Sequence, residues 1–304
     1  MINHSDCAPR PLTALLLINE NSRNGKASRE QAKASLLSHR IEVIEPAKDD
    51  HRSSSDLIRA YADGIDLVII GGGDGSLNAA AAGLISSGLP LGVLPLGTAN
   101  DFARTLGISS DLQQAVKIIA AGHRRAIDLG EVNGHLFFNV SSIGFSATLA
   151  RHLTAESKKR WGTFGYALAA FKLLKQSRPF SASLEHDGVT EKVKTVQVSV
   201  GNGRFYGGGM TIEQSAAPDD GRLDVYSLEI AHGWQMIALL PALRRGTHGR
   251  WRRVRTFSTT ALTLTTRRPH DINADGELIG RTPARFTIKA KAIQVFAPAS
   301  TGVS

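Results

Sequence analysis

The sequence predicts two lobes: an N-terminal doubly wound α/β lobe and a C-terminal β-sandwich lobe, with a cleft between them. Up to about residue 124, short apolar runs alternate with segments of helical periodicity, which indicates a parallel sheet covered by helices. Beyond that point strand patterns dominate, and several alternate apolar and polar residues, which is typical of antiparallel strands. No Pro/Gly/Ser-rich linker separates the halves, so we expect them to pack closely around the cleft.

The first lobe is expected to follow a leader at 1–10 and to span 11–133. Its strands are short and mostly apolar, as in DLVII, because strands of a parallel sheet are buried on both faces. The predicted strands are 14–18, 41–44, 66–70 and 91–94. The predicted helices are 26–39, 53–62, 76–87 and 111–121. Ser53 to Asp56 supply a capping sequence for the second of these helices.

The second lobe is expected to span 134–304, and its strand patterns begin just before that boundary. The predicted strands are 124–129, 136–142, 181–186, 195–200, 223–228, 257–265, 286–290 and 293–296. Helical periodicity interrupts them at 165–176 and 232–243.

Composition restricts the class of protein and of partner. The formal net charge of +9 and the pI near 9.9 favour an anionic partner: a nucleotide, a nucleic acid or an acidic lipid. The single cysteine, Cys7, excludes an intramolecular disulfide and a multi-cysteine metal site. Apolar runs fall well short of the roughly 20 residues that a membrane span needs, and we expect a cytoplasmic protein.

The strongest chemical signal lies between the predicted strand 66–70 and the helix that follows it, and it reads GGGDGSLN over Gly71–Asn78. Glycines allow bare backbone N–H groups to approach a ligand, and a helix N-terminus adds a positive dipole. The loop lacks the G-K-[ST] of a Walker A loop and the G-x-G-x-x-G spacing of a dinucleotide loop. A tight strand–helix corner would also use glycine, but three in a row favour a phosphate-binding loop.

A second polar loop follows the next predicted strand and reads PLGTANDFAR over Pro95–Arg104. Parallel strands end at the same edge of a sheet, so both loops are expected to lie at that edge, where open α/β sheets bind their ligands. Thr98 and Asn100 would place a hydroxyl and an amide beside the first loop.

These two motifs resemble the diacylglycerol kinase catalytic domain family, specifically the bacterial lipid kinases of the YegS type. Three further segments resemble the family in the same order along the chain. They are GN with YGGG over 201–209, APDDGRLD over 217–224, and DGE over 275–277. The resemblance implies an ATP-dependent lipid kinase whose active-site cleft lies between the lobes, acting on diacylglycerol or a related lipid alcohol.

The resemblance implies that ATP is held by the first polar loop, by the second one and by the loop after strand one. The residues so implied are Asn19, Ser22, Gly72, Gly73, Asp74, Gly75, Ser76, Leu77, Asn78, Thr98 and Asn100. The loop after strand one reads NENSR where the family has N-P-x-S-G, so only its Asn and Ser match. The nucleotide preference is therefore open.

Transfer of a phosphoryl group needs neutralisation of the phosphate charge and an acceptor for the hydroxyl proton. With no Walker lysine, Mg²⁺ is expected to neutralise charge with the help of Asp74. The resemblance implies that the DGE turn supplies the general base, with Glu277 preferred over Asp275. A D-G hairpin turn with a solvated Glu is the alternative.

The resemblance also implies a structural metal site formed by the Asp220 carboxylate and the carbonyls of Ala217 and Arg222. An Asx turn without metal is an equal alternative.

The stretch Arg244–Arg255 carries six arginines and one tryptophan in twelve residues. Arginines bind lipid phosphates and Trp favours the headgroup level, so we expect this stretch to contact an anionic membrane from the cytoplasmic side. Lys158–Trp161 is a smaller cluster of the same kind. Nucleic acid and a solvated helix end are the alternatives. For the whole chain, an NAD kinase-like phosphotransferase and a catalytically silent lipid- or nucleotide-binding protein are the rival functions.

Overall fold

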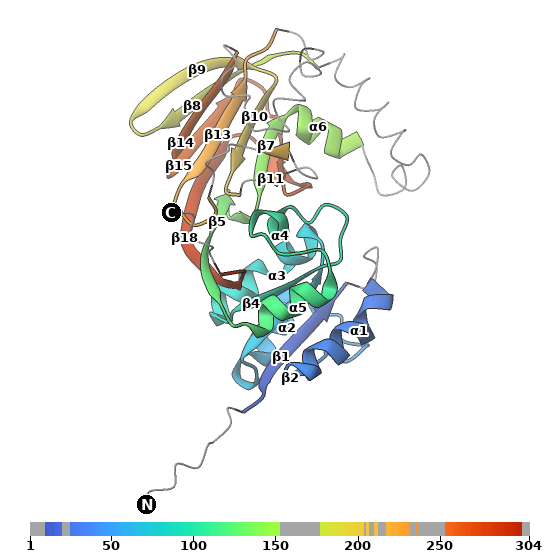
Figure 1. Cartoon of the computed structure of the whole chain (residues 1–304). Coiled ribbons are helices and arrows are strands. Elements are labelled where there is room, and N and C mark those ends of the chain that lie inside the picture. The colour runs from blue at the N-terminus through green and yellow to red at the C-terminus, as the bar shows by residue number, and fades with distance from the viewer. Residues whose placement is uncertain are drawn as a thin grey trace, which may run out of the picture. The chain divides into compact units, whose positions relative to one another are not determined.

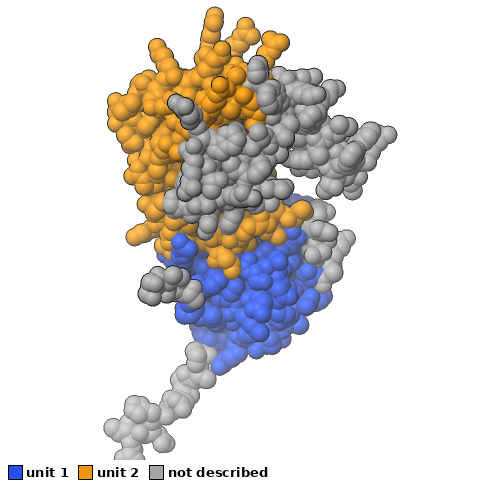
Figure 2. Space-filling view, turned by 45° about the horizontal axis from the view of Figure 1, so that its top comes forward, with its two compact units in different colours: residues 1–97, 108–125, 294–304 blue, residues 98–107, 126–293 orange. Residues whose placement is uncertain are grey.

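The structure, a computed structural model, describes residues 10–19, 25–152, 177–203, 205–206, 210–211, 217–231, 235 and 253–299 (Figure 1). The chain divides into two compact units, shown in two colours in Figure 2. Unit 1 comprises Met1–Gly97, Ile108–Arg125 and Gln294–Ser304, and unit 2 comprises Thr98–Gly107 and Ala126–Ile293. The helices expected at 165–176 and 232–243 lie outside the described residues, apart from Gln235, as do Cys7, Ser22 and the cluster Lys158–Trp161.

Unit 1 is built on a parallel sheet in the order β2-β1-β3-β4. Its strands are β1 (Leu12–Ile18), β2 (Ile41–Ile44), β3 (Leu67–Gly72) and β4 (Leu91–Pro95). Every residue of β3 and β4 is buried, because helices cover a parallel sheet on its faces. All four expected strands of the α/β lobe are confirmed to within two residues.

Side-chain capping residues mark the start of two helices of unit 1. Ser53 accepts a hydrogen bond from the Asp56 N–H at the start of α2, and Asp111 accepts one from the Gln114 N–H at the start of α5. The helices are α1 (Gly25–Ser38), α2 (Ser54–Tyr61), α3 (Asp74–Ser87) and α5 (Leu112–Ala120), with a 3₁₀ turn at Ala62–Gly64. Each lies at a predicted helix, although α3 begins two residues earlier than expected.

Unit 2 is a β-sandwich, as predicted. One layer has the order β18-β15-β8-β9, with β5 beside β18 and β6 beside β5; the other has the order β14-β13-β10-β7-β16-β17. The strand pairs of defined register within these two layers are antiparallel, and β18 also makes a parallel contact with β4 in unit 1. Side chains such as Phe137, Val198, Leu264 and Phe286 form its core, each of them fully buried.

The bounds of the described strands of unit 2, and of its helices, follow. The strands are β5 (Arg124–Val132), β6 (His135–Phe137), β7 (Val140–Gly144), β8 (Phe180–His186), β9 (Val189–Thr195), β10 (Gln197–Gly201), β11 (Phe205–Tyr206), β12 (Met210–Thr211), β13 (Leu223–Leu228), β14 (Val254–Thr259), β15 (Ala261–Thr266), β16 (Asp271–Ala274), β17 (Glu277–Arg281) and β18 (Ala284–Phe296). The helices are α4 (Asp101–Thr105) and α6 (Phe145–His152). The first residues of β5 and the last of β18 belong to unit 1.

Four predicted strands are divided differently in the structure. The strand expected at 257–265 is wrong: β14 ends at Thr259, β15 begins at Ala261, and the two lie in different layers of the sandwich. Conversely, 286–290 and 293–296 are parts of one strand, β18, which continues through Lys291 although its φ is 50°. The expected strand 136–142 is divided between β6 and β7.

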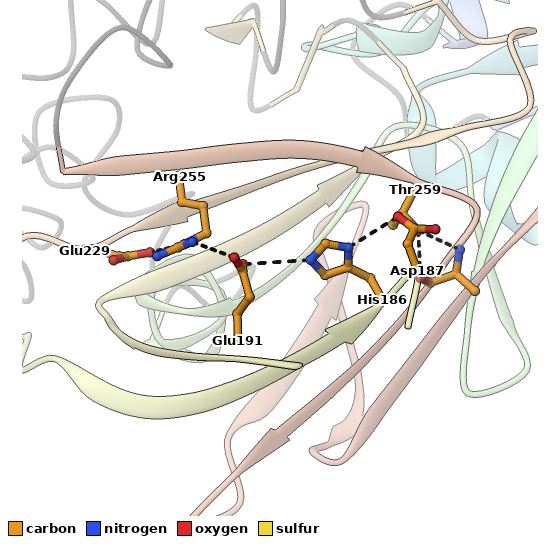
Figure 3. Close-up of polar contacts among 7 residues, drawn as sticks. His186, Asp187, Glu191, Glu229, Arg255 and Thr259 are labelled. Carbon is orange, nitrogen blue, oxygen red and sulfur yellow. Dashed lines mark hydrogen bonds and ion pairs between the residues drawn. The ribbon is translucent and has the colours of Figure 1, made fainter. Parts of the chain in front are cut away.

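A chain of charged groups joins the two layers of the sandwich at one side (Figure 3). Arg255 of β14 donates from Nη1 to Glu191 of β9 at 2.8 Å and from Nε to Glu229 at 2.6 Å. Because β9 and β14 are the outer strands of different layers among the described residues, this arginine ties the layers together at their edges. The His186 ring stacks on Phe257 with centroids 3.9 Å apart and extends the same seam.

In the described part of the chain, no helix has the length and apolar character needed to cross a bilayer.

Candidate active site

The glycine loop of unit 1 lies where three parallel strands end. The Asn19 N–H after β1 donates to the Gly71 carbonyl at 2.9 Å. The N–H groups of Leu96 and Gly97, after β4, both donate to the Gly72 carbonyl, at 3.0 and 3.2 Å. The end of β3 is therefore held from both sides, and the glycine loop and the beginning of the second polar loop are neighbours, as the sequence predicted.

Gly72 is required by a close approach within this loop. A Cβ atom at Gly72 would lie 2.3 Å from Oγ and 2.7 Å from Cβ of Ser76. Ser76 Oγ in turn accepts a hydrogen bond from Asn19 Nδ2 at 3.3 Å. Gly73 is the N-cap of α3 and brings no side chain to the helix N-terminus. The loop thus offers bare backbone and a helix dipole, which is the donor set that a phosphate group requires.

The residues after Gly73 have different surroundings in the first turns of α3. Asp74 is half-buried and Gly75 is exposed, so both reach the surface of unit 1. The Leu77 side chain is only 3% exposed and packs in the core, so its backbone alone is available to a ligand. Asn78 Oδ1 is buried and has no hydrogen-bond partner among the described residues, which leaves an acceptor for a ligand or for water.

The second polar loop continues from unit 1 into unit 2 after Gly97. Thr98 is exposed, and Asn100 occupies the N-cap position of α4 with a φ of 50°, where its side chain makes no capping hydrogen bond. Asp101 is 4% exposed and lies 3.6 Å from Arg104 Nη1. Phe102 packs edge-on against Phe138, with centroids 4.8 Å apart, which fixes α4 on the sandwich.

The DGE segment forms the tip of the β16–β17 hairpin. Ala274 pairs with Glu277, and the two residues between them, Asp275 and Gly276, have φ values of 44° and 96°. Two successive positive φ angles define a type I′ turn, which matches the twist of a two-residue hairpin. The turn places the Glu277 side chain in an exposed position. The hairpin alternative is therefore confirmed as local structure, and it is compatible with a catalytic Glu277.

Asp275 has a different environment from Glu277. Its carboxylate accepts the backbone N–H groups of Phe138 at 2.7 Å, Asn139 at 3.1 Å and Val140 at 2.9 Å. These bonds hold the link between β6 and β7 against the hairpin. Asn273 Oδ1 accepts the Gly276 N–H at 3.1 Å and supports the same turn. The lone pairs of Asp275 are thus directed at the backbone, whereas those of Glu277 are accessible.

The predicted structural metal site lies in a compact turn of unit 2. Asp220 Oδ1 accepts the Arg222 N–H at 2.9 Å, which is the Asx bond that the alternative interpretation expected. Loss of solvation raises the pKa of Asp220, and the carboxylates of Asp128 and Asp219 raise it further. The described residues contain no cluster of three or more acidic, histidine or cysteine side chains suited to a metal ion. A cation here would therefore need backbone carbonyls, such as that of Ala217, as its other ligands.

Three buried polar residues around these sites were not singled out from the sequence as site residues. Asp128 is 1% exposed and accepts the N–H groups of Gly221 and Lys291, both at 2.6 Å. Asn202 Nδ2 donates to the carbonyls of Asp128 at 2.8 Å and Phe138 at 3.1 Å. Asn139 lies on the strand link that Asp275 holds. Asp128 and Asn139 lie in predicted strands, and a polar Asp or Asn in such a strand is the signal that would have found these two.

The cationic stretch Arg244–Arg255 is described only from Arg253 onward. Arg253 is exposed. Arg255, in contrast, is engaged by Glu191 and Glu229 in the seam described above, and these carboxylates raise its pKa. Arg255 therefore stabilises the sandwich, and the contact of the Arg244–Arg255 stretch with a membrane stays a prediction.

Comparisons with known proteins agree with this architecture. The family model for the diacylglycerol kinase catalytic domain matches residues 13–132, and that for the YegS C-terminal NAD kinase beta sandwich-like domain matches residues 139–297. A diacylglycerol kinase from Staphylococcus aureus strain bovine RF122 / ET3-1 is 28% identical over 242 residues, which cover 79% of this chain and 77% of that protein. The relative from strain JH9 gives the same values.

Two solved structures from Bacillus anthracis str. Sterne share the fold. The first superimposes with a TM-score of 0.80 over 98% of this chain and 99% of the other, at 23% identity. The second, named as a diacylglycerol kinase, gives a TM-score of 0.71 over 95% and 97%, at 20% identity. With both family models matched in order over nearly the whole chain, this protein belongs to the YegS-like diacylglycerol kinase family and is a lipid kinase.

Proposed function

We propose that this enzyme transfers the γ-phosphoryl group of Mg-ATP to the hydroxyl of diacylglycerol or a related lipid alcohol, at the cytoplasmic face of a membrane. The observation that carries the proposal is the close approach of Gly72 to Ser76 at the uncapped N-terminus of α3, where three strand ends meet. This cradle excludes a side chain and presents backbone to an anionic ligand. The name of the Staphylococcus aureus relatives supports diacylglycerol as the acceptor.

In this proposal the phosphates of ATP contact the backbone of the Gly72–Ser76 turn, and Asn19, Asn78, Thr98 and Asn100 provide polar contacts around them. Ser22 remains a candidate from the sequence and lies outside the described residues. Asp74, half-buried in the first turn of α3, would hold Mg²⁺, which supplies charge neutralisation for the phosphates. The donor set fits, because carboxylate and phosphate oxygens are the ligands that Mg²⁺ prefers.

The proton of the acceptor hydroxyl passes, in this proposal, to Glu277. Its exposed carboxylate at the tip of a type I′ hairpin is free to approach a hydroxyl, whereas the carboxylate of Asp275 is bound to backbone N–H groups. Asp275 is therefore assigned as a positioning residue that fixes the hairpin, and Glu277 as the general base.

A panel of acceptors tests the proposal. Purified protein is incubated with ATP labelled at the γ-phosphorus and with diacylglycerol, a sphingoid base or NAD, each in the same detergent micelles. Label in phosphatidic acid supports the proposed reaction. Label in NADP supports the NAD kinase-like alternative, and label in none of the three products, with ATP binding retained, supports a silent nucleotide-binding protein.

A further inference from the structure

Unit 2 presents an outer sheet surface that no part of the proposed phosphoryl transfer uses. It is the solvent side of the layer β18-β15-β8-β9, whose strands lie side by side (Figure 1). Its inner side carries apolar residues of the sandwich core such as Leu184, Leu264 and Phe286. Alternation along the strands therefore directs a second set of residues outward.

Strand register defines this outer set, because directly opposed residues of antiparallel strands share a face. Ser181 pairs with Lys194, Ser183 with Lys192 and Glu185 with Thr190 across β8 and β9. Thr263 of β15 lies between Glu185 and Arg285, and Thr265 pairs with Ser183. We name this set the hydroxyl-cation face: Ser181, Ser183, Glu185, Thr190, Lys192, Lys194, Ala261, Thr263, Thr265, Arg285 and Thr287.

The charge of the hydroxyl-cation face is unbalanced. Lys192, Lys194 and Arg285 are exposed, and the structure gives none of them an ion pair with another described residue. Glu185 is the single carboxylate of the face. By contrast, the neighbouring cations Lys289 and Arg255 are each paired with glutamate, Lys289 with Glu131 at 2.9 Å.

We infer that the hydroxyl-cation face binds the surface of an anionic phospholipid bilayer. Serine and threonine hydroxyls donate to phosphate oxygens, and each basic residue near an anionic membrane contributes about 1 kcal/mol. The face carries no aromatic side chain, so it lacks the stacking platforms that a sheet uses for single-stranded nucleic acid. The face also lacks large apolar side chains. We therefore expect an electrostatic contact in which no side chain is inserted into the hydrocarbon core of the bilayer.

Lysines on β9 also have a simpler explanation. β9 is the outer strand of its layer, and edge lysines protect a free edge from pairing with other chains. That explanation accounts for neither Arg285, on the interior strand β18, nor the row of hydroxyls between it and β9. The seam of Arg255 and Glu191 lies on the opposite side of β9, since Glu191 alternates with Lys192 and Lys194.

The test is co-sedimentation of the full chain with vesicles of phosphatidylglycerol and phosphatidylcholine, compared with vesicles of phosphatidylcholine alone. Lys192→Gln/Lys194→Gln is expected to lower the partition coefficient on anionic vesicles about 30-fold, and adding Arg285→Gln about 160-fold in total. Glu185→Gln should strengthen binding. The matched control is Lys48→Gln/Lys117→Gln, which removes the same charge from exposed positions of unit 1 and should leave binding within about twofold.

Equal losses in the two double variants would overturn the inference, because net charge and not this face would then govern binding. A loss of binding to a single-stranded oligonucleotide, with vesicle binding intact, would overturn it in favour of nucleic acid. The inference takes its choice of a bilayer from the proposed lipid acceptor, but the measurement uses neither ATP nor turnover. Failure of the phosphoryl-transfer proposal would therefore appear in the acceptor panel and leave the vesicle result unaffected.

Discussion

Asp275 and Val140 bind each other through two hydrogen bonds: the Asp275 N–H donates to the Val140 carbonyl at 2.9 Å, and the Val140 N–H donates to the Asp275 carboxylate, also at 2.9 Å. The reciprocal pair joins the tip of the β16–β17 hairpin to the start of β7. Because of this pair, Asp275 fixes the backbone of the DGE turn, whereas the side chain of Glu277 remains accessible.

The first prediction uses this separation. Glu277→Gln should lower turnover by roughly 10²–10⁴-fold and leave the free energy of unfolding nearly unchanged, since an exposed carboxylate is removed. Turnover and urea denaturation of the same preparation measure both quantities. A variant with turnover within a few-fold of the wild type would remove Glu277 from the role of general base.

Asp275→Asn should have the complementary effect. An amide offers one acceptor oxygen to three backbone N–H groups that now bind a carboxylate, so the free energy of unfolding should fall by about 2 kcal/mol or more. Turnover should fall less than in Glu277→Gln when measured well below the unfolding temperature. A fully stable Asp275→Asn protein without activity would reverse the assignment of the two residues.

A second substitution tests the cradle itself. Gly72→Ala should weaken ATP binding by about tenfold or more, because forcing a methyl group into a packed position costs about 1–3 kcal/mol. Gly64→Ala is the matched control, since a Cβ atom there meets nothing within 4 Å. Calorimetric titration with ATP compares the two; similar affinities in both variants would show that phosphate does not bind at Gly72.

Asp74→Ala should abolish phosphoryl transfer while the protein still folds, because the carboxylate is only half-buried on the surface of unit 1. Circular dichroism and the acceptor assay are measured on one preparation. Near wild-type activity would contradict the assignment of Asp74 to the phosphate site.

The turn at Asp220 predicts a dependence of stability on pH and on Mg²⁺. The folded state raises the pKa of this carboxyl above its ordinary 3.8, so its ionisation costs stability increasingly as the pH rises above that value. Asp220→Asn should therefore be at least as stable as the wild type at pH 7 without metal, and the difference should disappear in acid. If a cation binds here, MgCl₂ should raise the Tm of the wild type more than that of Asp220→Asn. Equal shifts would leave the Asx turn as the whole explanation.

The fold was predictable to a large extent because its signals are local. The strands β1 to β4 are short apolar runs, and the capping residues Ser53 and Asp111 are adjacent to the helices they begin. The break at Thr260 was missed because residues 257–265 are rich in Thr, which favours strands on both sides of the break, and tertiary packing assigns the two strands to different layers. The hairpin strand β9 was missed because its residues, VTEKVKT, are mostly polar.

In the candidate site, too, the features that depend on adjacent residues could be predicted and those that depend on distant residues could not. The glycine loop could be found from the sequence, because its glycines, the strand before it and the helix after it are contiguous. The role of Asp275 could not, because its partners Phe138 and Val140 are separated from it by 137 and 135 residues. The pairing of Arg255 with Glu191 could not be predicted for the same reason, since the two are 64 positions apart in the sequence.

The central claim, that this lipid kinase phosphorylates diacylglycerol from ATP, is tested most directly by a single comparison. Wild type and Glu277→Gln are each incubated with γ-labelled ATP, Mg²⁺ and diacylglycerol in mixed micelles, and labelled phosphatidic acid is counted over time. The account predicts steady formation of phosphatidic acid by the wild type and a rate roughly 10²–10⁴-fold lower in the variant. No labelled phosphatidic acid from folded, ATP-binding wild type would contradict it.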